Sequence, residues 1–142
     1  MGKIVIPISF GPYEDPKLTN YLITSWFKKE TPQLKTPKYV RDYIHASLLA
    51  KYYLYFADKV IASKGELKIN PSGYRGTVAD FSMLVAREMT KRLGIECKVT
   101  MPDQTEFSEP LERVNTDDIQ EVRDSWKESA AWDQLAEFYK NR

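Results

Sequence analysis

Short β-type runs alternate with amphipathic helical segments along the chain, and this alternation is the feature that most limits its fold. The β-type runs are apolar or alternate between apolar and polar residues, whereas the helical segments repeat their apolar residues every three or four positions. We expect strands at residues 3–9, 40–45, 66–70 and 95–101. We expect helices at residues 18–28, 49–60 and 77–93, with one or two more after residue 110. The β-α-β-α order predicts an α/β domain built in layers.

The helix that begins after Thr77 has the clearest boundaries. The Thr77 hydroxyl can cap its first N–H groups, Asp80 stands at the capping-box position, and Gly94 ends it. Pro7 fits poorly inside the first strand because it has no N–H to donate. Near the C-terminus we expect a buried set of apolar residues, namely Trp126, Trp132, Leu135 and Phe138.

Size and charge limit the class of protein. The chain has 142 residues, and we expect one domain spanning residues 1–142. Its 21 basic and 20 acidic residues give a net charge of +1, without the basic excess of a nucleic-acid-binding protein. Cys97 is the single cysteine, which suits a reducing compartment, and no apolar run approaches the ~20 residues of a membrane-spanning helix. We therefore expect a cytoplasmic protein with no nucleic-acid or membrane partner.

No complete catalytic site is visible. His45 and Cys97 cannot form a zinc site by themselves, and no nucleophile elbow, Walker loop or Gly-x-Gly-x-x-Gly loop occurs. The Tyr-x-x-x-Lys pairs, Tyr13/Lys17 and Tyr55/Lys59, match an acid/base pattern. With nine tyrosines a chance match is expected, and Pro16 keeps the first pair off a regular helix. We therefore name no catalytic, cofactor-binding or metal-binding residue.

Two segments could bind an anion. The turn at residues 70–77 leads into a helix N-terminus, where Arg75 could reinforce the helix dipole; alternatively, Thr77 merely caps the helix. Residues 73–76 also match the Gly-x-x-Gly loop of an RNA-binding KH domain, although that loop joins two helices. Arg41 could clamp a phosphate with two hydrogen bonds; alternatively, it forms a surface pair with Asp42 or a structural ion pair.

Three segments, in this order, resemble the C-terminal part of the extended short-chain dehydrogenase/reductase family, the NAD(P)-dependent epimerases, dehydratases and reductases of nucleotide-sugars. Phe10-Gly11-Pro12-Tyr13 resembles the family's aromatic-Gly-Pro stretch, and Arg41-Asp42-Tyr43-Ile44-His45 its Arg-Asp-aromatic-Ile-His segment. Residues 69–78 are similar to its Asn-x-(Gly/Ser)-x-Gly stretch ahead of a helix, and residues 107–117 to a surface-polysaccharide branch. The resemblance covers nearly all of this chain but only about half of a family member.

The resemblance implies a partial Rossmann-type sheet joined to the small substrate-binding α/β part of such an enzyme. It implies that Arg41 and Arg113 contact the diphosphate of a nucleotide-sugar. The candidate substrate-binding residues are Arg41, Arg113, Tyr13, Tyr74 and Arg75. The chain departs from the family at Ile8, where an Asn is usual, and at Leu48, where an acidic residue is common.

We therefore expect the nucleotide-sugar-binding half of an epimerase, dehydratase or reductase of surface-polysaccharide biosynthesis, incomplete as a catalyst alone. NAD(P) is implied by the family, but this chain has no residues to bind it, so we expect the cofactor-binding half to be missing from it. The chain would be a truncated remnant, or would pair with a companion Rossmann polypeptide or with itself, because a partial sheet exposes an edge and an apolar face. The alternative is a binding or assembly module on the same scaffold. The sugar, the reaction and the choice of NAD or NADP stay open.

Overall fold

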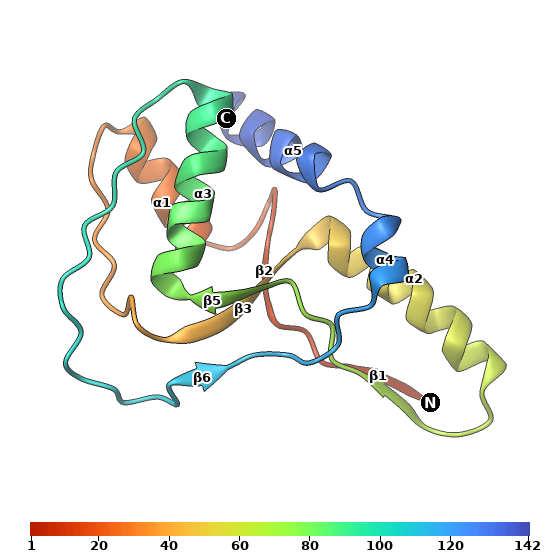
Figure 1. Ribbon diagram of the computed structural model, residues 1–142. Coiled ribbons are helices and arrows are strands. Elements are labelled where there is room, and N and C mark those ends of the chain that lie inside the picture. Colours follow the sequence, from red (N-terminus) through yellow and green to blue (C-terminus); the bar gives the residue numbers. More distant parts are fainter.

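A computed structural model describes residues 1–142, and Figure 1 shows its mixed α/β arrangement. The strands are β1 (Gly2–Ile4), β2 (Ile8–Phe10), β3 (Val40–His45), β4 (Leu67–Ile69), β5 (Tyr74–Thr77) and β6 (Glu112–Arg113). The helices are α1 (Leu18–Phe27), α2 (Ala46–Ala62), α3 (Val78–Leu93), α4 (Gln120–Asp124) and α5 (Glu128–Lys140). The predicted α/β class is confirmed.

The strands form two sheets. In the four-stranded sheet, β3 pairs in parallel with β2 and with β6, and antiparallel with β5. The second sheet is a parallel pair of β1 and β4. Two-stranded parallel sheets are rare because parallel strands are normally covered by neighbours and helices. The β1–β4 pair is thus a partial sheet, as expected from the sequence.

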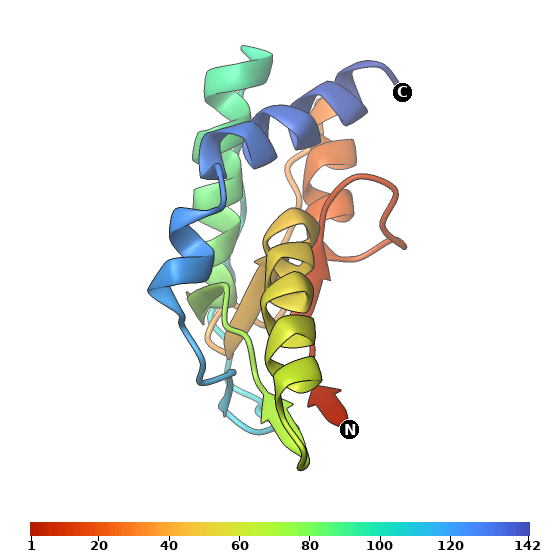
Figure 2. The same cartoon turned by 90° about the vertical axis from the view of Figure 1, so that its right-hand side faces the viewer.

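Strand β3 separates two hydrophobic cores. Successive side chains of a strand point to opposite faces, so Tyr43 enters one core and Ile44 the other. The larger core has 16 buried residues under α1, α3 and α5, and Tyr43 stacks on Phe81 there with 3.9 Å between ring centroids. The smaller core has 6 buried residues and lies between α2, α4 and the β1–β4 pair. We call these two parts the body and the arm; Figures 1 and 2 show the arm extending from the body.

Local signals explain the helix ends. Thr77 and Asp80 form the predicted capping box, and Gly94 closes α3 in the left-handed conformation with φ of 65°. Helix α1 ends in the same way but without glycine, because Lys29 adopts φ of 60°. Gly73 has no room for a side chain, since a Cβ there would collide with the backbone carbonyl of Tyr43.

Three of the predicted strand boundaries were wrong. The first strand is split into β1 and β2 around Pro7, which cannot donate to a ladder. The predicted turn after residue 70 becomes strand β5 from Tyr74 onward, because it pairs with β3. Residues 95–101 form only a single bridge, between Gln33 and Thr100, because their neighbour is a proline-containing loop. The short strand β6 was not expected.

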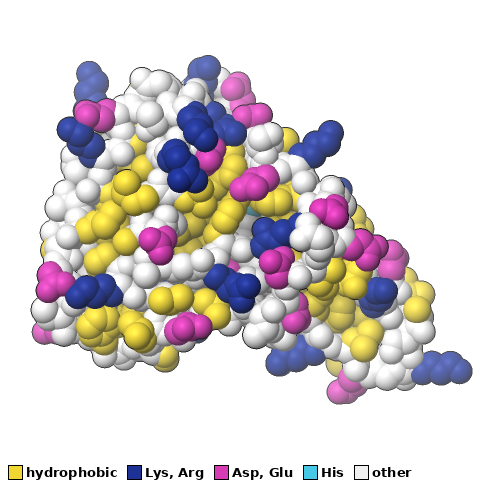
Figure 3. All heavy atoms as spheres, viewed as in Figure 1, with side chains coloured by type: hydrophobic (Ala, Val, Ile, Leu, Met, Phe, Trp, Pro, Cys, Tyr) yellow, Lys and Arg dark blue, Asp and Glu magenta, His cyan; other side chains and the backbone are white.

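The surface is of mixed charge. Figure 3 shows acidic and basic side chains interspersed over one face, with hydrophobic side chains between them. No helix in the structure combines the length and the apolar character needed to cross a membrane.

Candidate functional site

Arg41 is a buried cation held by backbone groups rather than by a carboxylate. Its residue is 7% exposed, and its guanidinium lies over the Tyr39 ring, 4.4 Å from the centroid. Nη1 donates to the carbonyl oxygens of Val40, Pro110 and Leu111 at 2.8, 3.1 and 3.3 Å. Nη2 is buried without a hydrogen-bond partner. A buried guanidinium with a spare donor can form one more hydrogen bond, and an anion is the strongest acceptor for it.

Strand pairing places Arg113 beside Arg41. Strand β6 runs parallel to β3 with Arg113 in register with Arg41, so the two side chains leave the sheet next to each other. The Arg113 side chain is 58% exposed and pairs with Glu109 at 3.3 Å.

Both arginines line one cavity of about 350 Å³. The cavity is also lined by Val5, Ile6 and Pro7 of the connection between β1 and β2, and by Ile8, the first residue of β2. In Figure 1 this connection passes close to the segment that follows β6. The position of the expected family Asn is thus in the cavity wall, but here it carries the apolar side chain of Ile8.

A hydrogen-bond network around Asp42 fixes the walls of this cavity. The Asp42 carboxylate is buried and accepts from Ser72 Oγ and the Gly73 N–H at 2.7 Å each, and from the Asn115 N–H at 3.1 Å. The Asn115 side chain donates to the carbonyl oxygens of Val5 and Pro71 at 2.8 and 2.9 Å. These bonds tie β3, the segment after β4, the segment after β6 and the β1–β2 connection into one unit. Sequence reasoning missed Asn115, for which no motif gives a signal.

The suggested Arg41–Asp42 ion pair is not formed, because adjacent residues of a strand point to opposite faces. The helix N-terminus after Thr77 has no free N–H for an anion either. The N–H groups of Val78 and Ala79 donate to Tyr39 and Pro37, while those of Thr77 and Asp80 are used by the capping box. The capping interpretation of Thr77 is therefore the correct one. The KH-type loop is not formed, since residues 74–77 are a strand.

The other three candidate residues do not line this cavity. Tyr13 is 88% exposed in the loop after β2, with φ of 63°, and its ring lies 4.6 Å from that of Phe138. The Tyr74 hydroxyl donates to Glu128 at 2.6 Å, and burial raises the pKa of this phenol. Arg75 is exposed on β5. Their role in substrate binding stays a prediction.

His45 and Cys97 show no sign of activation. His45 is buried, its Nδ1 lies 2.7 Å from Ser47 Oγ, and burial lowers its pKa to about 4. Burial raises the pKa of the Cys97 thiol, which disfavours the reactive thiolate. Leu48 is fully buried in the arm, so it does not reach the cavity. No group of three or more His, Cys, Asp or Glu side chains is placed to hold a metal ion.

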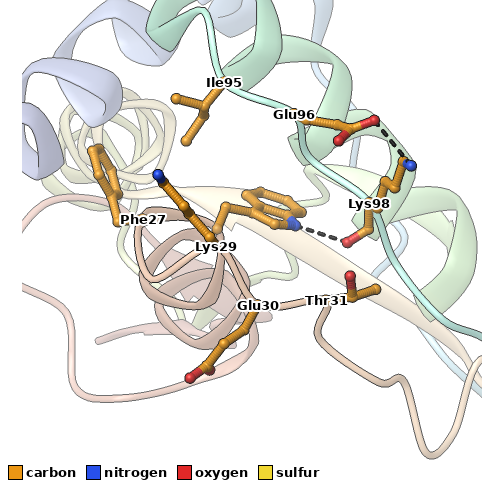
Figure 4. A pocket seen from close by; sticks show the side chains of 8 residues that line it. Phe27, Lys29, Glu30, Thr31, Ile95, Glu96 and Lys98 are labelled. Carbon is orange, nitrogen blue, oxygen red and sulfur yellow. Dashed lines mark hydrogen bonds and ion pairs between the residues drawn. The ribbon is translucent and has the colours of Figure 1, made fainter.

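A second cavity, of about 380 Å³, lies between the end of α1 and the segment after α3 (Figure 4). It combines apolar side chains such as Phe27 and Ile95 with charges of both signs, and Glu96 pairs with Lys98 at 3.0 Å. None of the five candidate residues lines it. Its mixed charge gives no preference for an anion.

Neither a family model nor a curated protein matches this sequence. Solved structures do match: MoeE5 with UDP-glucose and NAD has a TM-score of 0.68 at 13% identity, over 99% of this chain and 47% of that chain. A UDP-N-acetylglucosamine 4-epimerase from Methanobrevibacter ruminantium M1, in complex with UDP-N-acetylmuramic acid, has a TM-score of 0.69 at 16% identity, over 99% and 46%. The UDP-glucose 4-epimerase of Thermus thermophilus, in complex with NAD, has a TM-score of 0.63 at 17% identity, over 98% and 46%.

At these identities the likeness shows the fold. The chain spans about half the length of the solved structures that it resembles. The resemblance to part of an extended short-chain dehydrogenase/reductase, drawn from the sequence, is confirmed at the level of the fold.

Proposed function

We propose that this chain forms the nucleotide-sugar-binding part of a cytoplasmic NAD(P)-dependent epimerase, dehydratase or reductase that serves surface-polysaccharide biosynthesis. The observation that carries the proposal is the pair Arg41 and Arg113, in register on one cavity, with a buried Arg41 donor that lacks an acceptor. The fold supports it, because the matching structures include complexes with UDP-glucose and UDP-N-acetylmuramic acid.

The two arginines suit a diphosphate. A guanidinium presents a planar set of donors that matches two phosphate oxygens, and two such groups side by side match two linked phosphates. A phosphate oxygen would supply the acceptor that Arg41 Nη2 lacks once the side chain turns this buried donor into the cavity. Asp42 also borders the cavity, but its oxygens are occupied by three donors, which reduces its repulsion of an anion.

The residues of this chain do not fit NAD(P). A dinucleotide needs a parallel strand, a glycine-rich loop and a helix N-terminus that together cradle the pyrophosphate. Here the N-terminus of α3, which follows Gly73 and Gly76, is capped; the segment between β2 and α1 contains the single glycine Gly11, and the six glycines of the chain are scattered. We therefore derive no hydride transfer from these residues, and propose that an α/β polypeptide segment outside them binds the dinucleotide. The open edge of β1, which pairs only with β4, is where such a segment could continue the sheet.

Titration calorimetry with UDP-glucose, UDP-glucuronic acid and UDP tests the proposal. Arg41→Lys keeps the charge but removes the planar donor set, and Arg113→Gln removes the second guanidinium. Each should weaken binding at least about tenfold, the effect of losing a hydrogen bond to a charged group. Arg87→Gln is the matched control, because that side chain is 64% exposed on α3. Folded protein that binds no nucleotide-sugar, alone or with a dinucleotide-binding companion, would contradict the proposal.

A second candidate is a binding or assembly module that has lost ligand recognition. Ile8 favours it, since an apolar side chain stands in the cavity wall where the family has an amide. Under this alternative, changing Arg41 alters stability or partner binding while nucleotide-sugar titrations stay flat for every variant.

A further inference from the structure

The cavity of Arg41 and Arg113 combines two kinds of lining. Apart from the two arginines, its polar side chains are those of Asp42 and Asn115. The rest is apolar and comes from the β1–β2 connection, the first residue of β2 and the segment after β6, namely Val5, Ile6, Pro7, Ile8 and Val114. We call this second set the apolar lining. A ligand in this cavity therefore meets cations and hydrocarbon together.

The polar groups beside the apolar lining already have partners. The Asn115 side chain donates to two carbonyl oxygens, one of which belongs to Val5. The Val5 N–H donates to the Ile69 carbonyl oxygen at 2.9 Å, and Pro7 has no N–H. The Asp42 carboxylate accepts three donors. The side-chain donors left for a ligand are therefore those of the two arginines.

The apolar lining presents surface that a ligand can cover. Ile6 is 48% and Ile8 37% exposed, and both line the cavity. A ligand hydroxyl placed against them would lose its water without gaining a hydrogen bond, which is unfavourable. A methyl group in the same place would gain from leaving water. The cavity is thus suited to a ligand that carries an apolar group close to its anionic part.

In a nucleotide-sugar, the diphosphate stands between the ribose and the sugar. A cavity of about 350 Å³ is at the small end of the range for ligand sites, so it holds the diphosphate and one of these two neighbours. The ribose of a UDP-sugar always keeps its two hydroxyl groups. The sugar can lack a hydroxyl, and a sugar with a methyl group matches the apolar lining.

We propose that this cavity selects a 6-deoxy-sugar, with the arginines on the diphosphate and the sugar methyl group against Ile6 and Ile8. The inference rests on the proposed function, because it needs a nucleotide-sugar diphosphate at Arg41 and Arg113. Ile8 is then a specificity-determining residue. Its departure from the family's Asn changes which sugar is bound.

Titration calorimetry with UDP-glucose and UDP-6-deoxyglucose, which differ by one hydroxyl, tests this selection. The wild type should bind the deoxy-sugar about tenfold more tightly, the effect of one buried hydroxyl without a partner. Ile8→Asn should abolish or reverse the preference, because an amide can bond the hydroxyl, and the smaller change Ile8→Thr should reduce it. Ile61→Asn is the matched control, since Ile61 is 83% exposed on α2 and does not line the cavity. Far-ultraviolet circular dichroism checks that each variant is folded.

UDP separates a failure of this inference from a failure of the proposed function. If UDP binds, and Arg41→Lys weakens it, but the wild type binds both sugars equally, the selection is wrong and the proposed function stands. If folded wild-type protein binds neither UDP nor either sugar, alone or with a dinucleotide-binding companion, both are wrong. A preference that is unchanged in folded Ile8→Asn and Ile8→Thr excludes Ile8 as its cause. A tenfold preference for dUDP over UDP would place the ribose on the apolar lining instead of the sugar.

Discussion

Arg41 and Asp42 are adjacent, oppositely charged and both buried, yet each satisfies its charge elsewhere. Strand geometry sends them to opposite faces, so Arg41 turns to backbone carbonyls at the cavity while Asp42 accepts three donors. Arg41 keeps an unused donor, whereas both carboxylate oxygens of Asp42 accept hydrogen bonds. One side chain therefore keeps a donor in reserve, while its neighbour holds the cavity walls in place.

Asp42→Asn should lower the free energy of unfolding by about 2–3 kcal/mol, because an amide NH₂ replaces one oxygen and meets donors rather than acceptors. Chemical denaturation measures this. Asp103→Asn, at a side chain that is 75% exposed, should change the free energy of unfolding by less than about 0.5 kcal/mol. An equal, small effect of the two substitutions would contradict the structural role of Asp42.

His45, the single histidine, should stay neutral far below its ordinary range, because burial lowers its pKa from 6.5 to about 4. The unfolded chain takes up this proton first, so the free energy of unfolding should fall as the pH decreases from about 6.5 to about 4, by roughly 2–3 kcal/mol. Proton NMR of the imidazole during an acid titration measures the pKa directly. A midpoint near 6.5 would contradict the burial of this ring.

Glu14 acts in the opposite sense and must be controlled. Burial raises the pKa of its carboxyl from 4.5 to about 7, more than nearby Lys17 lowers it, so this group lowers stability as the pH rises through that interval. The stability measurements for His45 are therefore best made with Glu14→Gln as the background.

At the scale of the element, α1 and α3 end in the same left-handed turn with different residues. Lys29 at φ of 60° closes α1, and the Glu30 N–H returns to the Ser25 carbonyl at 2.9 Å; Gly94 at φ of 65° closes α3. A side chain in this conformation crowds its own backbone, a cost that glycine avoids. The α1 terminus is therefore strained where the α3 terminus is relaxed.

Lys29→Gly should stabilise the protein by about 0.5–1 kcal/mol, since the strain removed exceeds the added flexibility of the unfolded chain. Gly94→Ala should destabilise it by about 1 kcal/mol, although nothing lies within 4 Å of the new Cβ. Thermal unfolding of the two variants compares these opposite signs. A loss of stability in both would show that Lys29 makes a contact that outweighs its strain.

The elements with local signals could be predicted from the sequence. Capping by Thr77 and closure by Gly94 give α3 its boundaries, and the pairing of β3 with its neighbours agrees with its apolar pattern. Strands β5 and β6 could not be predicted, because they depend on pairing with a distant β3 rather than on their own residues. The same holds for the cavity. The sequence singles out Arg41, and only the family resemblance suggests Arg113, while the remaining lining and the position of Asn115 depend on tertiary contacts.

At the scale of the whole molecule, the two cores differ in size. The body buries 16 hydrophobic residues in its cluster and the arm 6, so the arm has less burial to resist opening. The β1–β4 pair adds an open edge to this smaller unit. The body is therefore well buried, whereas the arm would be stabilised by further contacts at its open edge.

Hydrogen exchange should reflect this division. Amides of α2, β1 and β4 should exchange faster than those of α1, α3 and α5 in dilute protein, because smaller buried clusters open more readily. Mass spectrometry of peptides from each element measures the rates. Equal protection of arm and body at every concentration would contradict two units of different stability.

The pairing of β6 with β3 joins residues from opposite ends of a long stretch of chain. Closing so large a loop is entropically costly and has little local structure to assist it, so this contact belongs among the late events of folding. A newly synthesised chain would then form its helices before Arg113 is placed beside Arg41. The time course of nucleotide-sugar binding after dilution from denaturant would therefore report when β6 pairs with β3.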